Sequence, residues 1–231
     1  MADSIVIVSA ARTPIGGMLG DFASLAAWEL GAVAIRAAVE RAGVQGDTVD
    51  EVLMGNCLMA GQGQAPARQA ARKAGLPDAT GAVTLSKMCG SGMRAMMFAH
   101  DMLAAGSANV VVAGGMESMT NAPHLLFARK GVRYGQAPLY DHMAIDGLED
   151  AYERGKAMGV FAENLRRQVR LHARGAGSVR DHLHHAQQAG QRRRQLRLGD
   201  RAGHAAGQGG RHDRSSSTSS RSRPGSTRSR A

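Results

Sequence analysis

The sequence is poor in the residues that cross-link or anchor a chain. It has 2 cysteines, Cys57 and Cys89, and 1 tryptophan among 231 residues. Two cysteines cannot form a disulfide framework, and they lack the paired spacing of a metal site, so we expect free thiols in a reducing compartment and no metal. No run approaches the roughly 18 apolar residues of a membrane helix. The short run Ser4–Val8 follows acidic Asp3 rather than a basic segment of the secretory type. We therefore expect a soluble, cytoplasmic protein without a membrane partner.

Charge is distributed unevenly along the chain. Residues 1–164 contain 13 basic and 16 acidic side chains, whereas residues 165–231 contain 16 basic and 3 acidic ones. The segment 165–231 also lacks Met, Ile, Phe, Tyr and Trp, so it has little apolar surface to offset the conformational entropy lost on folding. We predict a disordered basic tail over 165–231.

The remainder alternates short β-branched runs with alanine-rich segments of helical periodicity, which indicates a layered α/β domain over residues 1–118. On the first expected helix, the apolar residues between Trp28 and Val39 are predicted to form the buried face, and Gly43 to cap the end. The expected strands are 4–9, 50–55, 81–86 and 108–114, and the expected helices are 23–42, 64–74 and 91–105.

Residues 119–164 differ in character from the segments before them. Pro123, Pro138 and several glycines indicate a looped excursion, ending in a short helical stretch around 148–163. Long excursions of this kind usually have a functional role. We treat residues 119–164 as a partial second domain.

Cys89 has the most informative surroundings of any residue. It stands in Ser86–Ala95, between an expected strand and an expected helix, with Gly90 and Gly92 beside it. Unpaired N–H groups and the dipole at a helix start favour a thiolate, and the glycines permit close approach of a substrate. A buried structural cysteine is the alternative interpretation, and the residues alone leave the two about equal.

Four other features favour structural interpretations. Cys57 follows a strand directly and is interpreted as a small core residue. The methionines at 93, 96 and 97 have helical spacing and are also expected in the core. The pair Gly114-Gly115 indicates only a tight turn. The loop Gly61–Gln64 lacks the glycine spacing and the Lys-Ser/Thr of a phosphate-binding loop, and Pro66 marks the start of a helix.

Four segments within residues 3–164 form one pattern. They are the opening Ile5–Gly16, the loop from Gly61 to Ala70, the motif Cys89-Gly90-Ser91-Gly92, and Gly114–Met119. In sequence, order and distance these segments resemble the thiolases, most closely bacterial acetyl-CoA acetyltransferases. Together the motifs are highly specific.

The resemblance implies a thiolase fold and acyl transfer through a cysteine thioester. Cys89 aligns with the acyl-accepting nucleophile, and Leu148 and Met158 with neighbours of the bound thioester. The implied substrates are acetyl-CoA and acetoacetyl-CoA, within fatty acid metabolism and with no separate cofactor. The segment Ala122–Met143 resembles a loop that helps to assemble the tetramer, so a homodimer or homotetramer is expected. Ala157 stands where the family often has histidine.

The chain departs from the family after Asn164. The family's Asn-Glu-Ala-Phe-Ala segment, Gly-His-Pro histidine and second catalytic cysteine have no counterpart in residues 165–231. Residues 168–177 can be back-translated with suitable codons and read one nucleotide later. This shifted frame can encode Lys-Tyr-Gly-Phe-Thr-Arg-Glu-Ala-Gln-Asp, which resembles the family's next helix. We interpret the tail as out-of-frame translation, which resequencing and the intact mass would test. We expect an incomplete fragment, weakly active or inactive and poorly soluble, because two similar halves pack together in the family.

An alternative takes the tail as a nucleic-acid-binding segment. Arg192-Arg193-Arg194 and the Ser/Arg run from Ser215 to Arg230 could bind phosphates electrostatically. The tail has no aromatic residue for base stacking. We therefore favour the acyltransferase, and we do not expect nucleic acid as a partner.

Overall fold

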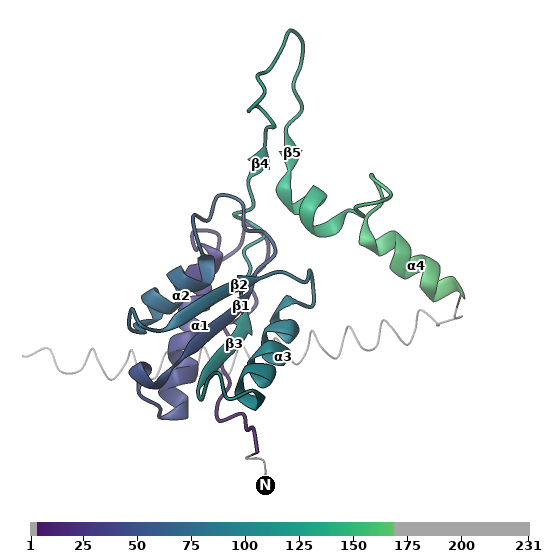
Figure 1. Cartoon of the computed structure of the whole chain (residues 1–231). Helices are drawn as coiled ribbons and strands as arrows, with labels where there is room; N and C mark the ends of the chain where they lie inside the picture. Colours follow the sequence, from purple (N-terminus) through teal and green to yellow (C-terminus); the bar gives the residue numbers. More distant parts are fainter. Residues whose placement is uncertain (1–3, 169–231) are drawn as a thin grey trace, which may run out of the picture. The chain divides into compact units, whose positions relative to one another are not determined.

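The computed structural model describes residues 4–168. The alternative function and the disorder predicted for residues 165–231 therefore rest almost entirely on residues outside the described part. The central feature is a sheet of three parallel strands in the order β2-β1-β3: β1 (Glu51–Gly55), β2 (Gly81–Leu85) and β3 (Val111–Gly115). Helices α1 (Ala27–Ala42) and α2 (Pro66–Ala74) cover one face, and α3 (Ser91–Ala104) covers the other (Figure 1). The predicted α/β layering is confirmed.

The central strand β1 contributes side chains to both faces of the sheet. Val52 and Met54 join a buried cluster with α1 and α2, whereas Leu53 joins Ala95 and Ala99 of α3 in a second cluster. Helices on both faces explain why β1 and β3 contain runs of apolar residues without alternation. At the start of the sheet, two backbone N–H groups, from Asn109 and Val110, donate to the carboxylate of Asp50 and lower its pKa.

The end of α1 and the start of α2 match expectation, but α1 begins at Ala27 rather than at residue 23, and its buried face differs from the predicted one. Gly43 caps α1 with φ of 68°, and Pro66 opens α2. The buried residues of α1 are Ala27, Gly31, Ala32 and Ile35, while Val33 is 55% exposed. The predicted face from Trp28 to Val39 was therefore wrong in part. A Cβ on Gly31 would lie 2.6 Å from Met116 Sδ, so the smallest residues, not the larger apolar ones, occupy the tightest contact.

The strand predicted at 4–9 is wrong. These residues pair with no strand in the described part of the chain, and Ile7 is 86% exposed. β-branched residues stabilise a strand only when a neighbour supplies hydrogen bonds and packing. The residue pattern indicated the tendency of this segment to extend, but not the absence of a neighbouring strand.

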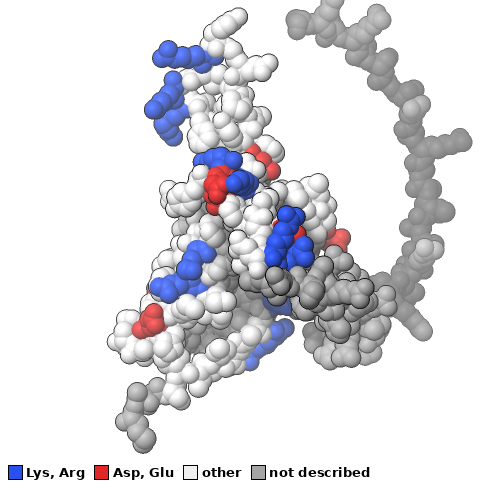
Figure 2. All heavy atoms as spheres, turned by 90° about the vertical axis from the view of Figure 1, so that its right-hand side faces the viewer, with Lys and Arg blue, Asp and Glu red and all other residues white. Residues whose placement is uncertain are grey.

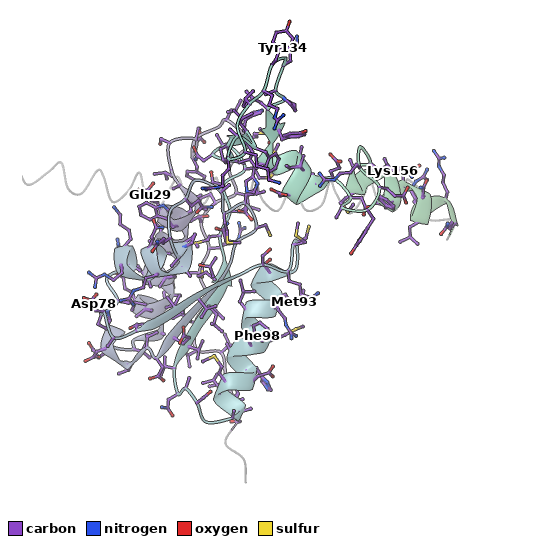
Figure 3. All side chains as sticks on the ribbon, turned by 45° about the horizontal axis from the view of Figure 1, so that its top comes forward. Glu29, Asp78, Met93, Phe98, Tyr134 and Lys156 are labelled. Carbon is purple, nitrogen blue, oxygen red and sulfur yellow. The ribbon has the colours of Figure 1, made fainter. Side chains whose placement is uncertain are left out.

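The excursion after the sheet begins with an antiparallel pair, β4 (His124–Leu125) and β5 (Tyr140–Asp141). The loop between these strands is exposed, with Tyr134 at its far end (Figure 3). The loop contains three exposed basic residues, Arg129, Lys130 and Arg133. Figure 2 shows blue Lys and Arg side chains at the upper end of the described surface.

The helical stretch predicted at 148–163 has different bounds. A short π-helix, η2 (Ala144–Leu148), comes first, and α4 (Met158–Gln168) follows. Between them, Glu149 pairs with Ala157 in an antiparallel bridge that closes a loop. Within residues 4–168, no helix combines the length and apolar character that a membrane crossing requires.

The outer side of α3 carries an apolar patch, and this contradicts the prediction that its methionines lie in the core. The side chains of Met93, Met96, Met97 and Phe98 are 62%, 51%, 47% and 39% exposed. Met93 and Phe98 project from the helix in Figure 3. Helical spacing of apolar residues does not distinguish burial within a domain from an uncovered face.

We expect Met93→Gln/Met97→Gln to raise solubility and lower binding of an apolar dye several-fold, because both side chains are exposed and on one helix face. Light scattering and dye fluorescence measure the effect. Val33→Gln changes a similarly exposed apolar residue on α1 and serves as the control. Equal effects of the two variants would show that the patch on α3 has no special role in association.

Candidate active site

Cys89 lies in the turn that joins β2 to α3, as predicted, and it is exposed with a free thiol. The turn is tight because Met88, directly before it, has φ of 49°. For a residue with a side chain, this left-handed conformation costs on the order of 1 kcal/mol. The carbonyl of Lys87 accepts from the N–H of Gly90 at 3.1 Å, which closes the turn. The exposure excludes the alternative of a buried structural cysteine.

Ser91, the first residue of α3, stabilises this turn through hydrogen bonds of its side chain. It is 4% exposed. Its Oγ accepts from the backbone N–H of Lys87 at 2.7 Å and donates to the carbonyl of Met88 at 2.6 Å. These two bonds hold the strained residue before Cys89 in place. Cys89 is therefore fixed at the helix N-terminus, where N–H groups without intrahelical acceptors point out of the helix.

Glycines let α3 approach the sheet closely beneath this turn. A Cβ on Gly55, the last residue of β1, would lie 2.6 Å from the backbone nitrogen of Gly92 and from Ser91 Cβ. A Cβ on Gly115, at the end of β3, would lie 3.4 Å from the Cα of Gly92. The start of α3 therefore rests on the backbone of two strands, which sets the position of the Cys89 turn.

Cys57 was interpreted as a core residue, and this was wrong. It is half-buried and reaches the same turn from the loop after β1. Its Sγ lies 3.1 Å from the carbonyl oxygen of Met88 and 3.4 Å from Ser91 Oγ. The parallel pairing of β1 with β2 brings these two strand ends together. Position directly after a strand was the one signal in the sequence that could have suggested this proximity.

Glu117 holds the loop that carries Cys57, a structural role that the sequence did not indicate. Its carboxylate accepts from the backbone N–H groups of Cys57 at 2.8 Å and Leu58 at 3.1 Å. It also accepts from the side-chain amide of Asn56, which is 1% exposed, at 2.5 Å. Glu117 thus links the segment after β3 to the segment after β1 and holds the loop that carries Cys57.

His142 ties the excursion to the same loop, and it too was missed. It is 6% exposed. Nε2 accepts from the N–H of Ala60 at 3.3 Å, and Nδ1 lies 2.7 Å from the carboxylate of Asp146. This arrangement assigns the hydrogen to Nδ1, because Nε2 faces a donor. Both nitrogens are engaged in holding the loop.

Leu148 and Met158 flank the bridge between Glu149 and Ala157, so the structure places them near each other. Each is 42% exposed. Within residues 4–168, no hydrogen bond joins either of them to the Cys89 turn. Among these residues, no cluster of three or more His, Cys, Asp or Glu side chains has the arrangement of a metal site.

The fold is a layered α/β domain, in which helices cover both faces of a parallel sheet. At the carboxyl edge of this sheet, a strand-to-helix turn presents an exposed cysteine, which is a candidate nucleophile. The family model described as "Thiolase, N-terminal domain" matches residues 5–182. The chain belongs to the thiolase family.

Curated relatives agree with this assignment. The acetyl-CoA acetyltransferase of Cupriavidus necator is 54% identical over 162 residues, which are 70% of this chain and 41% of the relative. That of Rhizobium meliloti is 52% identical over 168 residues, 73% of this chain and 42% of the relative. The mitochondrial enzyme of Rattus norvegicus is 47% identical over 169 residues, 73% and 39% respectively. The chain thus spans about two fifths of the length of these relatives, and they give the nucleic-acid alternative no support.

Proposed function

We propose that this chain carries the acyl-accepting cysteine of an acetyl-CoA acetyltransferase, and that Cys89 is this residue. The observation that supports it most directly is an exposed thiol at the start of α3, on a turn held by Ser91. The family membership and the names of the relatives supply the chemistry.

The first step is transfer of an acyl group to Cys89. The Sγ thiolate attacks the carbonyl carbon of acetyl-CoA, and the bond from that carbon to the sulfur of coenzyme A breaks. Coenzyme A leaves as a thiolate that takes up a proton, and an acetyl thioester remains on Cys89. Backbone N–H groups at the start of α3 stabilise the negative oxygen of the intermediate. Gly90 and Gly92 leave room for the thioester to approach.

The second step joins two carbon atoms. A second acetyl-CoA, deprotonated at its methyl carbon, attacks the acetyl group on Cys89 and yields acetoacetyl-CoA and the free thiol. It requires a base, and His142 is not suited to this role because both of its ring nitrogens are engaged. We therefore propose that the chain is acylated at Cys89 but forms or cleaves acetoacetyl-CoA weakly or not at all.

We also propose which residues contact the substrate and how the complete protein assembles. Leu148 and Met158 would contact the bound thioester, in a loop domain over residues 119–164 that follows the α/β domain of residues 1–118. The complete protein would form a homodimer or homotetramer, act in fatty acid metabolism and reside in the cytoplasm. No separate cofactor or metal would take part.

Radiolabelled acetyl-CoA tests the acylation. We expect label on the tryptic peptide Met88–Arg94 of the folded chain and its complete loss in Cys89→Ala, because only the thiol can carry the thioester. Peptide mapping under acidic conditions locates the label. Cys57→Ala removes the other thiol and is the matched control, which should still be labelled. Label on the peptide that contains Cys57, or no label on folded protein, contradicts the proposal.

A further inference from the structure

The two cysteines of this chain meet at one turn although they are far apart in the sequence. Cys57 Sγ lies 3.1 Å from the carbonyl oxygen of Met88. Covalent geometry places the Cα of the following residue within about 3 Å of that oxygen, so Cys57 Sγ lies within about 6 Å of the Cα of Cys89. The Cys89 side chain reaches about 3 Å from its Cα. A Cys89 rotamer directed toward Cys57 would therefore bring the two sulfur atoms to within about 3 Å of each other.

The two thiols differ in exposure in a way that suits different roles. Cys89 is exposed, so a small oxidant can reach it from solvent. Cys57 is half-buried, and its position is fixed by the bonds of Glu117 to its N–H and of its own sulfur to Met88. A thiol held beside an oxidised cysteine reacts with it faster than a thiol from another molecule.

We infer that Cys57 and Cys89 form an oxidation site, in which Cys57 is the resolving thiol for peroxide-oxidised Cys89. Hydrogen peroxide oxidises the Cys89 thiolate to a sulfenic acid, and one oxygen of the peroxide leaves as water. The Cys57 sulfur then attacks the Cys89 sulfur, a disulfide forms, and the hydroxyl leaves as a second water molecule. In sum, two thiols and one peroxide give one disulfide and two waters.

The disulfide has a definite chemical consequence. In the disulfide, the Cys89 sulfur is protected from further oxidation to the sulfinic and sulfonic acids. Thiols can reduce the disulfide, but they cannot reduce these two acids. This inference goes beyond the proposed acyl transfer and does not depend on it, since peroxide needs only an accessible thiol.

Peptide mapping after brief exposure to hydrogen peroxide tests the inference on the full chain. After quenching with an alkylating reagent, we expect a non-reduced tryptic product that joins Ala42–Arg68, which contains Cys57, to Met88–Arg94, which contains Cys89. Dithiothreitol should separate the two peptides and restore both thiols. The peptide measurement is needed because methionine oxidation also changes the intact mass.

Cys57→Ser is the matched variant. We expect no internal disulfide in it and at least five-fold more sulfinic and sulfonic acid on Cys89 than in the unmodified chain. Circular dichroism establishes that the variant is folded, and a sample in guanidinium chloride supplies the rate for the unfolded chain. Formation of the linked product no faster in the folded chain than in guanidinium chloride overturns the inference. So does equal overoxidation of the two proteins, or linkage between chains only.

Discussion

Gly55→Ala is expected to destabilise the chain by about 3 kcal/mol or more, because the new methyl group would overlap backbone atoms that cannot move independently. Its Cβ would lie 2.6 Å from the nitrogen of Gly92 and from the carbonyl carbon of Ser91. Relief requires α3 to move away from β1, and Cys89 would move with the helix start. Urea unfolding measures the change in stability, and the alkylation rate of Cys89 measures the displacement of the turn.

Gly17→Ala is the control for this prediction, because no atom lies within 4 Å of its added Cβ and its φ is not in the left-handed region. We expect a change within about 0.5 kcal/mol for this variant. Similar unfolding midpoints for Gly55→Ala and Gly17→Ala would contradict the close contact between β1 and α3.

Glu117→Ala is expected to cost about 2–4 kcal/mol, because the N–H groups of Cys57 and Leu58 would lose their acceptor in a largely buried setting. Asn56, which is 1% exposed, would also lose a partner. Glu117→Gln should fall between the wild type and Glu117→Ala. It retains one oxygen but presents an amide N–H group to a backbone donor. Urea unfolding gives the energies, and hydrogen exchange at Cys57 and Leu58 locates the loss.

The matched surface control is Glu40→Ala on α1, an exposed position where alanine is a good helix former. We expect it to change stability by no more than about 0.5 kcal/mol. Unchanged exchange rates at Cys57 and Leu58 in Glu117→Ala would show that the carboxylate does not hold this loop.

The local features of the fold could be predicted from the sequence because they depend on nearby residues. Short apolar runs located β1, β2 and β3, Gly43 marked the end of α1, and the glycines around Cys89 indicated the strand-to-helix turn. The resemblance to thiolases rested on motifs in the same segments, and the family match bears it out.

The missed features depend on contacts between distant segments. Residues 4–9 have the composition of a strand, yet a strand also needs a neighbour, which no local pattern reveals. Cys57 and Glu117 meet because β1 and β3 are adjacent in the sheet, so their role follows from topology. The methionines of α3 show the same limit, since periodicity gives a face but not what covers it.

The aromatic residues divide between the two regions of the described chain, and this gives the molecule two separate optical reporters. Trp28, the sole tryptophan of the sequence, packs against the buried cluster beneath the sheet. All three tyrosines, Tyr134, Tyr140 and Tyr152, belong to the excursion. Indole emission therefore follows the layered domain alone, while phenol absorbance follows the loops beyond it. A single denaturation experiment can thus reveal whether the two regions lose their structure together or in sequence.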